Sequence, residues 1–201
     1  MSKDYSFFLP KLLTFPILVL VGTSIINFSN FMDGIDGIVG GCYFVIFIMA
    51  SITIDKMYIP LAASILAFLI LNWHPSKLFM GDIGSTFLGA MFFTVLLQCQ
   101  SIVEGFAFIL ISIPLMLDAL ICVLRRYKNG KNIFTPHRDH LYQRLKDNNL
   151  PTEKISIIYI LATLLISLSY LFFGIYLAII SSFLVLVFGI IIDKKFAIKF
   201  T

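Results

Sequence analysis

The chain has 201 residues, of which 59% are hydrophobic and 13% are charged, and its formal net charge is +4. A soluble domain carries about 25% charged residues, so the composition excludes an ordinary soluble domain. Apolar runs of roughly 17 to 22 residues have the length that an α-helix needs to cross a bilayer. The sequence therefore predicts an all-α, polytopic membrane protein.

Seven apolar runs predict seven transmembrane helices in a single integral membrane domain, residues 1–201. The runs cover residues 7–27, 37–54, 58–72, 86–99, 103–124, 155–173 and 175–192. The third and fourth are short, which predicts tilted helices or segments that face a cavity. The cysteines Cys42, Cys99 and Cys122 lie in separate runs without metal-binding spacing and are interpreted as buried small hydrophobic residues.

Basic residues are distributed unevenly between the two sets of loops that these spans define. Lys3, Lys11 and Lys56 fall on one side. The other side holds twelve of the fifteen: Lys77, Arg125, Arg126, Lys128, Lys131, Arg138, Arg144, Lys146, Lys154, Lys194, Lys195 and Lys199. The positive-inside rule makes this side cytoplasmic, and three polar motifs also fall on it.

The first polar motif, NFSNFMDGIDGIVGG, follows the first apolar run. Asn27, Asn30, Asp33 and Asp36 recur in steps of three, which keeps side chains adjacent on a helix or helical turn. Carboxylates at membrane depth are costly and mark functional sites. Capping of a helix end would explain one such residue but not four. The glycines between them are expected to let a ligand approach the backbone.

The second motif, LFMGDIGSTFLG, places Asp82 between two glycines at the start of an apolar run. An aspartate there serves either as a helix N-cap or as a hard oxygen ligand for Mg²⁺ beside a phosphate-binding helix N-terminus. Backbone amides of residues 84–86 would suit phosphate oxygens, and Phe79 offers an aromatic face to a base.

The third motif, TPHRDHLYQRL, lies in the long basic loop and carries His137, Arg138, His140 and Arg144. All four can meet phosphate, and on a helix the two histidines and Arg144 would share a face. The histidine pair could also bind zinc, but the sequence offers no third ligand of the right type nearby. A solvated loop that only fixes topology is the other interpretation.

Asp118 is the one acidic residue placed deeper, about two turns before Arg125. A structural ion pair with Arg125 or Arg126 and a role in the site are equally compatible with its position.

Together the motifs fit phosphoryl transfer at a membrane surface, which needs a metal, cationic groups and in-line positioning. A transporter would spread its acids across the depth of the membrane, whereas most polar groups here gather at one face.

The three motifs, in this order and spacing, resemble those of the polyprenyl-phosphate N-acetylhexosamine-1-phosphate transferases, glycosyltransferase family 4. The resemblance implies transfer of a sugar 1-phosphate from a UDP-sugar to undecaprenyl phosphate in the cytoplasmic membrane. UMP is released, and Mg²⁺, or Mn²⁺ in its place, is required. It also implies a role in initiating cell-envelope polysaccharide, and homodimers are common in the family.

The resemblance assigns residues to roles. Asp82 matches the metal-binding aspartate, and Asn30 matches an asparagine that completes the metal site. Asp33 and Asp36 match paired catalytic acids, with Asp36 near the uracil and Phe79 stacked on the base. The remaining positions bind the substrate: Asn27 beside the acids, and His137, Arg138, His140 and Arg144 in the loop that grips the diphosphate or sugar, with His140 counted among the catalytic groups.

The sequence departs from the family's motifs at two points, and these limit which members it resembles and how much of their length. His140, Tyr142 and Gln143 stand where one branch has three clustered histidines, so the loop looks more like that of the O-antigen-initiating branch than of the peptidoglycan transferase. An aspartate pair in the N-terminal half of the family has no counterpart, so the match covers the C-terminal portion of a longer fold. The alternative function is an inactive, truncated remnant that binds nucleotide sugar or lipid phosphate.

Overall fold

The computed structural model describes residues 11–133 and 135–200, and within these ranges it contains helices and no strands. This confirms the predicted all-α class. The helices are α1 (Lys11–Phe31), α2 (Ile38–Thr53), a short 3-10 helix (Lys56–Tyr58), α3 (Ile59–Asn72), α4 (Gly81–Gln98), α5 (Ile102–Ile111), α6 (Ile113–Lys128), α7 (Leu141–Asp147), α8 (Thr152–Phe173) and α9 (Ile175–Phe196).

Among the described helices, α1, α4, α8 and α9 are long and apolar enough to cross a membrane. Two apolar segments are shorter: α2, and the 3-10 helix together with α3 (Lys56–Asn72). Large apolar side chains cover their outer surfaces: Phe172 is 70% exposed and Phe183 is 64% exposed. Such continuous apolar exposure is typical of a surface that faces lipid. Each of the seven predicted runs contains a helix or, in the fifth run, a pair of helices.

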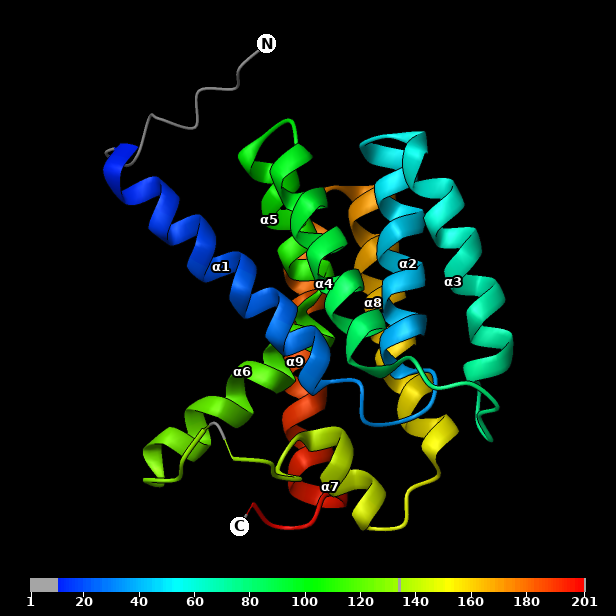
Figure 1. The fold of residues 1–201 in the computed structure, drawn as a ribbon, viewed down its shortest axis with the longest axis vertical. Coiled ribbons are helices and arrows are strands. Elements are labelled where there is room, and N and C mark those ends of the chain that lie inside the picture. The colour runs from blue at the N-terminus through cyan, green and yellow to red at the C-terminus, as the bar shows by residue number, and fades with distance from the viewer. Residues whose placement is uncertain (1–10, 134, 201) are drawn as a thin grey trace.

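The fifth run was expected to form one span over 103–124, and here the prediction of a single helix is wrong. The run divides at Ser112 into α5 and α6, whose axes are bent by 73°. Pro114 stands in the first turn of α6, where its missing N–H and fixed φ suit a helix start, whereas in a helix interior a proline removes a hydrogen bond and kinks the chain. As a result α6 runs away from the bundle (Figure 1), and its far end leads into the basic loop.

The three motifs meet at one end of the bundle. In Figure 1 the connection from α1 to α2, the segment before α4, and α7 all lie at the lower end, together with the C-terminus. The turns from α2 to α3, α4 to α5 and α8 to α9 lie at the opposite end. The predicted clustering is confirmed, while the assignment of this end to the cytoplasm remains a prediction from charge. Lys3 lies outside the described residues.

Close packing of α1 on α4 sets the relative position of the first two motifs. Gly89 in α4 lies so near α1 that an added Cβ would be 2.9 Å from Cα of Ile26 and 2.7 Å from Oγ of Ser29. Ser29 is fully buried and shares a hydrogen bond of 2.5 Å with the hydroxyl of Tyr43 in α2. Helix α1 therefore ends beside the start of α4, in a register fixed by small residues.

Candidate active site

Asn30 and Asp82 lie side by side where α1 ends and α4 begins. The helix α1 extends to Phe31, beyond the predicted end at residue 27, so Asn27 and Asn30 both stand on its last turns. The amide of Asn30 donates 3.1 Å hydrogen bonds to Asp82 Oδ1 and Ser85 Oγ. Asn27 and Asp82 are exposed and Asp33 is half-buried. The fold thus brings amide, hydroxyl and carboxylate groups of the first two motifs together. Asn30 and Asp82, which are in contact, are 52 residues apart in the sequence.

The surroundings of Asp33 change its pKa. Burial and, to a lesser degree, the negative charge of Asp82 raise its pKa from 3.8 to about 6. Two carboxylates in mutual repulsion at a half-buried position favour neutralisation by a proton or a cation. Because oxygen atoms are the ligands that Mg²⁺ prefers, the carboxylates of Asp33 and Asp82 fit a hard divalent metal ion. Asn30 would join them only with its amide turned so that the oxygen, and not the nitrogen, faces Asp82.

The raised pKa of Asp33 leads to a prediction about stability without metal. Between about pH 4 and pH 6 the folded chain binds more protons at Asp33 than the unfolded chain, so stability falls as pH rises through this window. We expect Asp33→Asn to raise the thermal unfolding midpoint at pH 7 in a chelator and to leave it unchanged at pH 4. An equal effect at both pH values would contradict this interpretation of Asp33.

Asp36 is held by a part of the second loop that the sequence analysis did not single out. His74 Nδ1 lies 2.8 Å from Asp36 Oδ2, and Ser76 Oγ donates to Asp36 Oδ1 at 2.9 Å. Although burial acts to raise the pKa of Asp36, these hydrogen bonds outweigh it and lower the pKa. Its backbone carbonyl also accepts from Ser156 in α8 at 2.7 Å. Asp36 is therefore an ionised anchor between three segments.

The glycines of the first motif make room for the protein itself, which corrects the expectation that they make room for a ligand. A Cβ on Gly34 would lie 2.0 Å from the hydroxyl of Tyr142, which donates to the carbonyl of Phe31 at 3.0 Å. Gly37 has φ +77, and a Cβ there would lie 2.9 Å from the ring of Trp73. Side chains of α7 and of the second loop thus fill the space beside Asp33 and Asp36.

The second motif offers an exposed aromatic group beside a helix N-terminus. Phe79 is 76% exposed, so its ring is free to stack on a planar ligand. Helix α4 begins at Gly81, five residues before the predicted start. The amides without helical partners are therefore those of residues 81–84, which shifts the expected phosphate-binding set of residues 84–86 toward Asp82.

The basic loop differs most from its predicted form, because two of its four expected phosphate ligands, His140 and Arg144, are buried and His137 is partly buried. His137, His140 and Arg144 have side chains that are 14%, 3% and 5% exposed, whereas Arg138 is 65% exposed. Arg144 pairs with Asp193 of α9 at 2.5 Å, and Arg138 pairs with Asp147 at 2.6 Å. Helix α7 begins only at Leu141, so the histidines do not share a helical face with Arg144.

Asp118 forms neither of the ion pairs considered for it. Its carboxylate accepts from the backbone amides of Leu141 at 2.8 Å and Tyr142 at 3.3 Å, and from the hydroxyl of Tyr159 at 2.7 Å. It therefore holds the N-terminus of α7, whose amides lack helical partners, against α6 and α8. The buried side chain of Arg126 instead pairs with Asp139 inside the loop.

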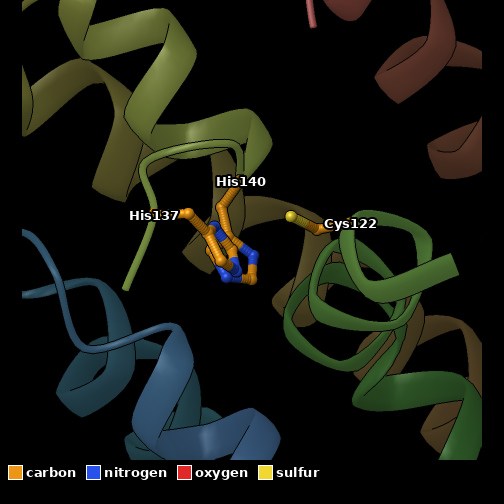
Figure 2. Close-up of side chains that lie close together, drawn as sticks. All are labelled: Cys122, His137 and His140. Atoms are coloured by element: carbon orange, nitrogen blue, oxygen red, sulfur yellow. The ribbon is translucent and has the colours of Figure 1, made fainter. Parts of the chain in front are cut away.

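Cys122 lies close to His137 and His140 and so adds the third zinc-type ligand that the sequence did not indicate. It lies in α6, and its sulfur points toward the rings of His137 and His140 (Figure 2). The expectation that no third zinc-type ligand lies near the two histidines is therefore wrong. The signal was hidden because Cys122 precedes His137 by 15 residues and only the path of the loop brings them together.

An apolar cavity of about 350 Å³ lies among α6, α8 and α9. Its walls are mainly aliphatic, and Arg125, Arg144 and Asp193 line its polar part, where Arg125 and Asp193 form a 2.7 Å ion pair. Such a lining suits a hydrocarbon chain and not a nucleotide.

Comparisons with known proteins show which family the sequence resembles. The family model described as glycosyl transferase family 4 matches residues 2–100. A probable undecaprenyl-phosphate N-acetylglucosaminyl 1-phosphate transferase of Bacillus subtilis is 31% identical over 147 residues, covering 66% of this chain and 40% of the relative. A decaprenyl-phosphate N-acetylglucosaminephosphotransferase of Mycobacterium tuberculosis is 32% identical over 154 residues, covering 61% of this chain and 38% of the relative.

A third relative is the undecaprenyl-phosphate alpha-N-acetylglucosaminyl 1-phosphate transferase of Yersinia pestis, 31% identical over 160 residues, covering 71% of this chain and 44% of the relative. The chain thus spans about two fifths of the length of these curated relatives.

Proposed function

Since the chain belongs to glycosyl transferase family 4, the polyprenyl-phosphate N-acetylhexosamine-1-phosphate transferases, we propose that it carries out their type of reaction. The substrates are a UDP-N-acetylhexosamine and undecaprenyl phosphate, and the products are the lipid-linked sugar diphosphate and UMP. The observation that carries this proposal is the group formed by Asn30, Asp33 and Asp82, with the exposed ring of Phe79 three residues before Asp82 in the chain.

Asn30, Asp33 and Asp82 are the residues that would hold Mg²⁺. Burial and, to a lesser degree, repulsion by Asp82 raise the pKa of Asp33, and this supports the role because a bound dication would favour its charged form. When bound, the metal neutralises charge on the phosphate oxygens during transfer. The N-terminus of α4 adds its unpaired amides and positive dipole end at the same place.

The chain's own residues bind and orient the donor. Phe79 stacks on the uracil, and Asp36, kept ionised by His74 and Ser76, accepts a hydrogen bond from it. Asn27 contacts the donor from α1. Arg138, the most exposed of the four expected cationic groups, leaves Asp147 to bind the diphosphate.

The remaining loop residues act through position. His140, buried beside Asp118, and Arg144, paired with Asp193, keep the loop in place instead of meeting phosphate in this conformation. An oxygen of the acceptor phosphate attacks the β-phosphorus of the donor, and the bond to the UMP oxygen breaks. Because the acceptor is already ionised, no strong general base is needed.

We propose the cytoplasmic face of the cell membrane as the place of reaction, because twelve of the fifteen basic residues accompany the motifs. The similarity to transferases for N-acetylglucosaminyl 1-phosphate supports an N-acetylhexosamine donor and a role in cell-envelope polysaccharide synthesis. A second copy of the chain is proposed as a partner on the basis of the family resemblance.

The test is transfer of labelled sugar phosphate from UDP-N-acetylglucosamine to undecaprenyl phosphate by the purified chain in lipid vesicles, with and without Mg²⁺. Metal-dependent formation of the lipid-linked sugar is the expected result. A folded chain that binds UDP-sugar but forms no product would instead establish the alternative, a binding remnant without transferase activity.

A further inference from the structure

One sulfur and two nitrogen donor atoms lie together where the basic loop passes α6. They belong to Cys122 of α6 and to His137 and His140 of the loop. All three donor atoms lie within 4.8 Å of one another. Bonds of about 2.0–2.3 Å from zinc to nitrogen and sulfur place such donors roughly 3.5 Å apart around one ion. Small side-chain rotations therefore suffice, and Figure 2 shows the thiol and the two rings converging from α6 and the loop.

His140 gives an independent sign of a missing ligand. Its side chain is 3% exposed, and its Nδ1 makes no hydrogen bond with any described residue. A buried polar atom without a partner is rare in folded proteins and calls for an explanation, such as a bound ion. The nearest carboxylate oxygen, Oδ1 of Asp118, is 3.9 Å away, too far for a hydrogen bond.

The histidines present neutral rings to a cation. Their rings stack with centroids 5.1 Å apart, which two protonated imidazoles would oppose. The thiol of Cys122 is buried and in no disulfide, so it can lose its proton to a binding metal.

An acidic side chain lies near each of the two histidines. Oδ1 of Asp118 is 3.9 Å from Nδ1 of His140, and Oδ2 of Asp139 is 3.9 Å from Nδ1 of His137. Both carboxylates are beyond hydrogen-bonding distance of the rings, but their negative charge favours a cation between the histidines. They also offset the positive charge of Arg126, which pairs with Asp139.

We propose that Cys122, His137 and His140 bind one zinc ion. Mixed sulfur and imidazole donors select zinc over Mg²⁺ and Ca²⁺, so this site is chemically distinct from the oxygen donors of Asn30, Asp33 and Asp82. The ion ties the loop that carries Arg138 to α6. The site is independent of the proposed transferase reaction.

The test uses the purified chain, stripped of metal by a chelator and titrated with Co²⁺ as a spectroscopic substitute for Zn²⁺. The expected result is one equivalent bound, with a thiolate-to-cobalt charge-transfer band and the strong visible bands of tetrahedral Co²⁺, both lost when Zn²⁺ is added. Cys122→Ala should remove the charge-transfer band and weaken binding by about 100-fold or more, since even residues behind the ligands change affinity 10- to 100-fold.

Matched variants separate this site from general effects on folding. Cys42→Ala removes another buried thiol and should leave the cobalt spectrum unchanged. His137→Gln, at the least buried ligand, should weaken binding in a chain that stays folded. Asp82→Asn should not affect it. A folded wild-type chain that binds no cobalt at one equivalent, or a Cys122→Ala chain that retains the charge-transfer band, would overturn the proposal.

Discussion

Replacing Asp82 by Asn is expected to abolish Mg²⁺-dependent transfer of sugar phosphate, with a loss of at least about 100-fold in rate. The substitution removes the charge of the exposed carboxylate that accepts from Asn30, while its remaining carbonyl oxygen can keep that hydrogen bond. The fold should therefore persist and the metal affinity should fall. Product formation from labelled UDP-N-acetylglucosamine and calorimetric titration with Mg²⁺ measure the two effects.

Asp55→Asn is the matched control, because Asp55 lies in the turn between α2 and α3 at the opposite end of the bundle. Its side chain accepts from the amide of Met57 at 2.8 Å, a role that asparagine can also fill. Transfer should be unchanged in this variant. Turnover within a few-fold of wild type in Asp82→Asn would show that Asp82 is not a metal ligand.

Replacing Gly89 by Val is expected to give the largest effect away from the site. A Cβ there would meet the backbone of α1 at 2.9 Å, and a backbone atom cannot move aside as a flexible side chain does. We expect the free energy of unfolding to fall by about 1–3 kcal/mol, as in other overpacked cores. Because the same packing places Asn30 against Asp82, Mg²⁺ affinity should fall as well.

Gly189→Val in α9 serves as its control, since a Cβ at Gly189 has no described atom within 4 Å. Thermal unfolding and Mg²⁺ titration of both variants make the comparison. Equal effects of the two substitutions would mean that helix propensity, and not the contact between α1 and α4, sets the outcome.

The site was only partly visible in the sequence. Asn30, Asp33 and Asp82 could be selected because polar residues in an apolar chain are costly and therefore conspicuous. His74 and Ser76, which hold Asp36, were missed because a histidine and a serine in a polar loop carry no such signal. The buried state of Arg144 was missed for a related reason: its partner, Asp193, belongs to α9, which is distant in sequence.

Length and hydropathy by themselves determined the all-helical class and the positions of the apolar segments. They also determined the gathering of three motifs at one end, because successive spans bring the chain out on alternate sides of the bilayer. Only the tertiary structure decided the use of the glycines and the approach of Cys122 to two histidines. These features depend on contacts between segments far apart in the chain, which local periodicity does not encode.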